Sequence, residues 1–159
     1  MQENEMLKAG DKAPDFKLES TNGEMVSLAD YKGRLNVVFY FYPKDNTSGC
    51  TKEACGFRDN LETIDAKDTV VLGVSPDSIK SHHKFIDKHN LNFTLLSDPE
   101  HTAAEAYGAW GEKKMYSKTY FGIIRSTFVI GKDGLIKEAF YKVKVNGHVE
   151  KVMEVLENL

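Results

Sequence analysis

The chain contains little cysteine, little proline and no strong excess of charge. Only two of its 159 residues are cysteine and four are proline, and the formal net charge is -3 at pH 7. So small a net charge does not mark a nucleic-acid binder or a ligand of anionic membranes. A chain of this length can bury a sizeable core without disulfide staples. We therefore expect a single domain over residues 1–159, with no nucleic-acid partner and no membrane partner.

Long hydrophobic runs are also missing. No stretch is long and apolar enough to span a bilayer. The first residues, Met1-Gln-Glu-Asn-Glu-Met6, are polar and acidic, unlike a signal peptide. We therefore expect a cytoplasmic location, where a stable structural disulfide is uncommon and paired cysteines more often serve redox chemistry or metal binding.

The histidines lack the spacing of a metal site. None lies four residues from another, and no Cys-x-x-Cys motif accompanies them. They are His82, His83, His89, His101 and His148. We expect them at the surface or as helix-capping residues, and we expect no metal and no cofactor.

Hydrophobic patterning predicts an α/β fold. Strands are expected over 35–42, 70–74, 94–96, 126–130 and 135–141, and helices over 49–66, 78–89, 101–107 and 149–156. An Asn22-Gly23 turn predicts a small N-terminal hairpin over 16–28. Residues 108–122 are expected to form a long loop, either packed by its own aromatic residues or lining an active site or a docking surface. This order favours a thioredoxin-like fold, with a mixed central sheet and helices on both faces.

Both cysteines lie in one predicted helix that follows the apolar strand. Pro43 ends the strand, and Thr47 can cap the helix just before Cys50. The first turn of a helix leaves N–H groups unpaired and favours negative charge, so a thiol there is pushed toward the reactive thiolate. The alternative is that Cys50 and Cys55 are two small buried apolar residues.

The spacing of the two cysteines has a geometric consequence. On an intact helix, residues five apart have Cα atoms about 8.6 Å apart and point about 140° apart around the axis. A disulfide requires Cα atoms within about 7 Å. A Cys50–Cys55 bond therefore requires the first turn of the helix to unwind, which is an inexpensive opening.

The segment around the cysteines resembles the peroxiredoxin motif Pro-x-x-x-Thr/Ser-x-x-Cys, with Pro43, Thr47 and Cys50 in the defining positions. Residues 42–59 are similar to the bacterioferritin comigratory protein (PrxQ) subfamily, as are residues 10–16, 75–77, 96–98 and 122–128. The resemblance runs from about Leu7 to the end of the chain. Ser48 and Ser117 stand where the subfamily often has Pro and Gly.

This resemblance implies thiol-dependent reduction of hydrogen peroxide and organic hydroperoxides. Cys50 would be the peroxidatic cysteine, oxidised by peroxide to a sulfenic acid. Cys55 would be the resolving cysteine, which closes an intramolecular disulfide that thioredoxin or a similar dithiol protein reduces. Because both cysteines belong to one chain, we expect a monomer.

Further residues would support this chemistry. Arg125 would hold the thiolate and the peroxide oxygens with its planar guanidinium, and its alternative is a charge at the surface. The Thr47 hydroxyl would cap the helix or donate to the thiolate, and Pro43 would close one side of the pocket. Glu53 and Arg58 are expected to pair across the helix.

Two other function classes remain open at this point. A thiol–disulfide oxidoreductase could use the same fold, although such enzymes usually carry Cys-x-x-Cys. A redox-sensing or chaperone-like binding module could use the same switch without turnover. Catalytic consumption of peroxide separates both from a peroxidase.

Overall fold

The computed structural model describes residues 6–159, so residues 1–5, on which the expectation of no signal peptide rests, lie outside it. The strands are β1 (Lys17–Ser20), β2 (Met25–Ser27), β3 (Asn36–Phe41), β4 (Thr69–Ser75), β5 (Thr94–Ser97), β6 (Trp110–Met115), β7 (Lys118–Ile123), β8 (Ser126–Ile130) and β9 (Ile136–Phe140). The helices are η1 (Leu28–Asp30), α1 (Ser48–Asp59), α2 (Leu61–Asp65), α3 (Ile79–His89), α4 (Thr102–Ala106) and α5 (His148–Glu157). None of the helices in this part of the chain is long and apolar enough to cross a membrane.

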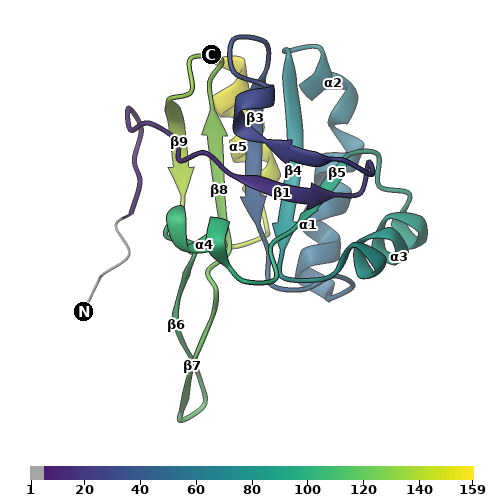
Figure 1. Ribbon diagram of the computed structural model, residues 1–159, viewed down its shortest axis with the longest axis vertical. Coiled ribbons are helices and arrows are strands. Elements are labelled where there is room, and N and C mark those ends of the chain that lie inside the picture. Colours follow the sequence, from purple (N-terminus) through teal and green to yellow (C-terminus); the bar gives the residue numbers. More distant parts are fainter. Residues whose placement is uncertain (1–5) are drawn as a thin grey trace.

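Within residues 6–159, seven strands form one mixed sheet in the order β2-β1-β5-β4-β3-β8-β9 (Figure 1). The central strands β3, β4 and β5 run parallel, and β8 pairs antiparallel with β3. The carboxyl ends of the parallel strands therefore meet at one edge of the sheet, and the start of β8 lies beside the end of β3. This arrangement is the predicted thioredoxin-like plan.

Alternate residues of β3 enter two separate cores, because successive side chains of a strand point to opposite faces. Phe39 packs on one face with α4 and the N-terminal segment, where its ring stacks on that of Phe16 at 4.3 Å between centroids. Tyr40 packs on the other face with residues of α1, α2, α3 and α5. The prediction of helices on both faces is confirmed.

The N-terminal hairpin is confirmed, and it is also part of the main sheet. Strands β1 and β2 pair around the predicted turn, with Leu18 opposite Val26. Strand β1 also pairs antiparallel with β5, where Ser20 lies opposite Leu96. The hairpin therefore completes one edge of the sheet.

The predicted loop over 108–122 is wrong, because these residues form the hairpin β6–β7, which projects from the body of the molecule (Figure 1). Lys113 lies opposite Tyr120, and its ammonium stands 6.0 Å from the centre of that ring. At the base of the hairpin the indole of Trp110 stacks on His101, with ring centroids 3.7 Å apart. Cross-strand contacts such as that between Lys113 and Tyr120 favour paired strands over a loop.

The predicted helix over 49–66 is divided in two at Asn60. The Asn60 backbone leaves helical geometry, and its side-chain amide donates to the carbonyl oxygen of Gly56 (2.8 Å). An Asn side chain that bonds nearby backbone in this way competes with helix continuation. Both cysteines precede the break and lie on α1.

Candidate active site

Cys50 is the third residue of α1, in the first turn, as predicted. The first intrahelical hydrogen bond of α1 runs from the Thr51 N–H to the Thr47 carbonyl (2.8 Å), so the N–H groups of residues 48–50 precede it. The Cys50 side chain points into the helix-covered core, and the residue is only 2% exposed. The sulfur therefore lies near the positive end of the helix.

Arg125 reaches this sulfur from the neighbouring strand. Its Nη2 atom donates to Cys50 Sγ at 3.2 Å, and its side chain is 16% exposed. The residue directly before β8 can do so because Ser126 lies opposite Phe41, at the end of β3 that leads to α1. The alternative of a surface charge is therefore wrong for Arg125.

Glu53 holds the same guanidinium from α1. Its Oε1 atom accepts a hydrogen bond from Arg125 Nη1 at 2.6 Å, and the residue is fully buried. The expected Glu53–Arg58 pair is wrong, because Arg58 donates instead to Asp59 and to the carbonyl of His89. In the sequence, the signal that could have placed Glu53 at the site was its position three residues after Cys50. Residues three apart share one face of a helix.

The burial of Glu53 changes its acidity. Loss of water raises the pKa of this carboxyl from 4.5 to about 7, and the attraction of Arg125 only partly opposes the rise. The second oxygen, Oε2, is buried and has no hydrogen-bond partner among the described residues. Glu53 therefore keeps its proton to a higher pH than an ordinary carboxyl group does.

His148 lies behind Glu53, at the start of α5. Its Nε2 atom is 2.8 Å from the Thr127 hydroxyl oxygen and 3.9 Å from Glu53 Oε2. Burial lowers the pKa of this imidazole from 6.5 to about 4, so the ring is neutral at pH 7. The prediction of surface or capping histidines is wrong for His148 and for His82, both of which are buried.

Thr47 is the N-cap residue of α1 by its extended backbone, but its hydroxyl does not cap the helix. It donates to the carbonyl oxygen of Lys44 at 2.9 Å, within the loop that leads from β3 to α1. The prediction of a capping hydroxyl is therefore wrong. Pro43, directly after the buried Tyr42, is half-buried at the start of that loop.

Cys55 lies on the same continuous helix as Cys50. It is half-buried, and both cysteines are free thiols. The helix therefore keeps their Cα atoms about 8.6 Å apart, beyond the reach of a disulfide. No group of three or more His, Cys, Asp or Glu side chains that could hold a metal occurs in the described part of the chain.

A thiol at a helix start with an arginine on its sulfur is the geometry of a reactive cysteine. The model of the AhpC/TSA family matches residues 9–139. The chain belongs to the AhpC/TSA family. Among curated members, Peroxiredoxin Bcp of Bacillus subtilis is 50% identical over 153 residues, with 96% of this chain and 97% of the relative covered. Peroxiredoxin Bcp of Escherichia coli is 46% identical over 150 residues, covering 94% and 96%.

Solved AhpC/TSA structures agree with this assignment. PrxQ of Xylella fastidiosa superimposes with a TM-score of 0.90 at 37% identity, covering 97% of this chain and 98% of that one. The bacterioferritin comigratory protein of Xanthomonas campestris gives 0.85 at 38% identity, covering 90% of each chain. Structures of that protein with a trapped intermediate or ligand bear on its alkyl peroxide reduction activity. The predicted subfamily resemblance is confirmed.

Proposed function

We propose that this AhpC/TSA protein is a thiol-dependent peroxidase in which Cys50 attacks the peroxide. The contact that carries the proposal is the 3.2 Å hydrogen bond from Arg125 Nη2 to Cys50 Sγ. The names of the bacterial relatives and the alkyl peroxide chemistry of the Xanthomonas campestris protein support the reaction class. The substrates are hydrogen peroxide and organic hydroperoxides.

In the first step the Cys50 thiolate attacks one peroxide oxygen and the O–O bond breaks. The sulfur becomes a sulfenic acid, and the other oxygen leaves as hydroxide or alkoxide and takes up a proton to form water or an alcohol. Negative charge grows on the leaving oxygen in the transition state. Arg125, held by Glu53 Oε1 at 2.6 Å, supplies fixed N–H donors to that charge.

In the second step Cys55 resolves the sulfenic acid. Its thiol condenses with the oxidised Cys50 sulfur, which forms a disulfide and releases water. Because both residues lie on α1, this step requires the first turns of that helix to unwind. A dithiol protein such as thioredoxin then reduces the disulfide and is itself oxidised, and a single copy of the chain is sufficient for the cycle.

Single-turnover oxidation of the two cysteine variants tests these roles. We expect Cys50→Ser to lose peroxide reduction, because the nucleophile is gone. We expect Cys55→Ser to consume one equivalent of peroxide and to retain a sulfenic acid, detected by mass spectrometry after trapping, without recycling by thioredoxin. Substantial turnover by Cys50→Ser, or an inert Cys50 in Cys55→Ser, contradicts the assignment.

A further inference from the structure

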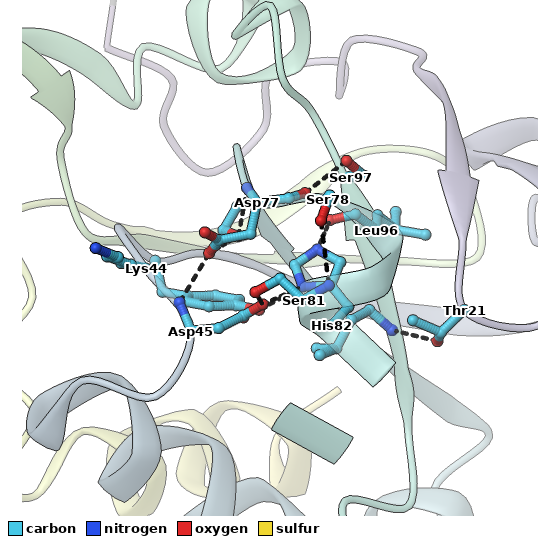
Figure 2. A network of polar contacts seen from close by, with 12 residues as sticks. Thr21, Lys44, Asp45, Asp77, Ser78, Ser81, His82, Leu96 and Ser97 are labelled. Carbon is cyan, nitrogen blue, oxygen red and sulfur yellow. Dashed lines mark hydrogen bonds and ion pairs between the residues drawn. The ribbon is translucent and has the colours of Figure 1, made fainter. Parts of the chain in front are cut away.

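The loop between β3 and α1 is held by a buried polar network that includes residues of α3 and of the ends of β4 and β5 (Figure 2). Its centre is Asp45, two residues before Thr47 and only 5% exposed. The Asp45 carboxylate accepts hydrogen bonds from Tyr42 Oη (2.5 Å) and Ser81 Oγ (2.8 Å), and it faces His82 Nδ1 at 2.7 Å. Tyr42 directly follows β3, and Ser81 and His82 belong to α3.

His82 is fully buried and connects Asp45 to the sheet. Its Nε2 atom lies 2.8 Å from the carbonyl oxygen of Leu96 in β5, and a carbonyl can only accept, so Nε2 carries a hydrogen. Its Nδ1 atom faces the Asp45 carboxylate, which is an acceptor when ionised. The buried imidazole therefore joins the Asp45 carboxyl group to the backbone of β5.

The backbone of the loop is fixed as well. The Asp45 N–H donates to Asp77 Oδ2 at 2.7 Å, and this same oxygen accepts from Ser75 Oγ at 2.8 Å. Ser97 Oγ donates to the Asp77 carbonyl at 2.6 Å. The loop is thereby connected to the ends of β4 and β5, two rigid strands of the central sheet.

A buried polar cluster of this kind is weak evidence for added stability, because the loss of water on burial offsets much of the gain from its hydrogen bonds. Its placement suggests another role. Asp45 is followed by Asn46, whose φ of 61° is left-handed, and then by Thr47, the N-cap residue of α1. A loop held at Asp45 through side chain and backbone fixes where α1 starts, and so fixes where Cys50 Sγ stands.

We propose that Asp45 and His82 are positioning residues that set the Cys50 sulfur against Arg125. The inference rests on the proposed peroxidase function, and it adds two residues that touch neither the sulfur nor the peroxide. Cys50 lies on α1 and Arg125 directly precedes β8, and the network holds only the loop that leads to α1. A displacement of about 1 Å between reacting groups can cost about 10²-fold in rate.

The test measures single-turnover oxidation of Cys50 by hydrogen peroxide in the full chain. We expect Asp45→Asn to slow it by about 10- to 10²-fold, since the amide cannot accept from all of the same donors. His82→Asn keeps a side-chain donor that can reach Asp45, and we expect it to retain more activity than Asp45→Asn. If Asp45→Asn does not fold, Tyr42→Phe removes one donor and leaves Asp45 and His82 in place, and we expect a smaller loss.

A double-mutant cycle separates positioning from general damage. In an Arg125→Ala background the contact to be positioned is gone, so we expect the loss caused by Asp45→Asn or Tyr42→Phe to shrink to less than threefold. Tyr107→Phe is the matched control, because it removes a buried hydroxyl bond, to the Pro14 carbonyl at 2.5 Å, in the core on the opposite face of the sheet. We expect its rate to equal that of the parent.

Two outcomes overturn the proposal. One is a folded Asp45→Asn or Tyr42→Phe protein that oxidises Cys50 as fast as the parent. The other is a loss that persists in full in the Arg125→Ala background, which indicates an effect independent of the contact. Failure of the proposed function itself looks different, because the parent protein then shows no peroxide oxidation that depends on Cys50.

Discussion

At the scale of single residues, Arg125 joins the Cys50 sulfur to the buried Glu53 carboxylate. One Nη atom donates to the sulfur and the other to the buried Glu53 carboxylate. Two parallel contacts of a planar guanidinium fix its orientation as well as its charge. Removal of this side chain therefore removes an aimed donor and leaves Glu53 buried without its partner.

We expect Arg125→Ala to slow Cys50 oxidation by about 10²–10³-fold, the usual cost of losing one donor to a developing negative charge. Arg125→Lys should recover part of the rate, since an ammonium supplies charge without the planar fork. Stopped-flow oxidation rates, with circular dichroism to confirm folding, measure both. Arg34→Ala is the control, because Arg34 is an exposed residue whose Nη1 donates to the Asp30 carbonyl. A folded Arg125→Ala protein within threefold of the parent contradicts this role.

Sequence reasoning found the residues that are marked by a motif and missed those marked only by burial. Cys50 and Arg125 follow from the cysteine motif and from their places beside predicted strands. His82 and His148 give no such signal, because a histidine in a polar sequence context looks exposed until the fold buries it. The Glu53–Arg58 prediction failed for a related reason: a carboxylate pairs with the nearest cation in space, and that cation is Arg125, directly before β8.

At the scale of elements, the proposed cycle requires α1 to adopt two conformations that exclude one another. Its continuous form places Cys50 in the first turn, and it separates Cys50 from Cys55 beyond bonding distance. Gly56 adds a constraint at the far side, because a Cβ there would stand 2.8 Å from Val149 Cγ2 of α5. The later turns are therefore tightly packed on α5, and the opening that a disulfide requires is expected at the first turns.

Amide hydrogen exchange tests this division of α1. We expect exchange over residues 47–57 to be faster in the disulfide form than in the reduced form, because unwinding breaks the intrahelical bonds that begin at Thr51 N. The buried strand β4 serves as the internal control and should exchange equally in both forms. Equal protection of residues 47–57 in the two forms indicates that the disulfide forms without unwinding, against this interpretation.

Elements with strong periodicity were predictable. The strand over 126–130 matches β8 in both bounds, and the two-residue turn signal located the N-terminal hairpin. The hairpin β6–β7 was missed because its strands carry exposed charged and aromatic residues instead of an alternating buried face. The pairing of β6 with β7 decided the structure of this segment, and the hydrophobic pattern of either strand alone does not reveal that pairing.

At the scale of the whole molecule, the two shifted groups of the site affect stability in opposite directions. The Glu53 pKa rises from 4.5 to about 7, so between these values the folded state keeps a proton that the unfolded chain has released. Stability from Glu53 therefore falls as pH rises through this window. The His148 pKa falls from 6.5 to about 4, so the unfolded chain binds a proton that the folded state does not, and stability from His148 rises with pH over that window.

Because the two windows overlap, the two contributions oppose one another in the parent protein, and single substitutions should separate them. Relative to the parent, we expect Glu53→Gln to gain stability with rising pH between about 4.5 and 7. We expect His148→Gln to lose stability, relative to the parent, as pH rises between about 4 and 6.5. Urea unfolding at a series of pH values measures both difference curves. Difference curves that are flat with pH show that neither group shifts on folding.

The overall architecture was accessible from the sequence because its strands and helices alternate in the order that a mixed layered sheet requires. The pairing of β1 with β5 was not, since it joins segments that lie far apart in the chain. The same holds for the network around Asp45, which gathers side chains from the loop, α3 and the strand ends (Figure 2). Long-range contacts of this kind depend on the completed fold.

The stacked Trp110 at the base of β6–β7 has a practical consequence. It is the chain's only tryptophan, and it lies opposite Ile123, two residues before Arg125. Indole fluorescence depends on the immediate surroundings of the ring, here the imidazole of His101 at 3.7 Å between centroids. The protein thus carries a single indole fluorophore beside the segment that contains Arg125, and movements of that segment can be followed through indole fluorescence without a label.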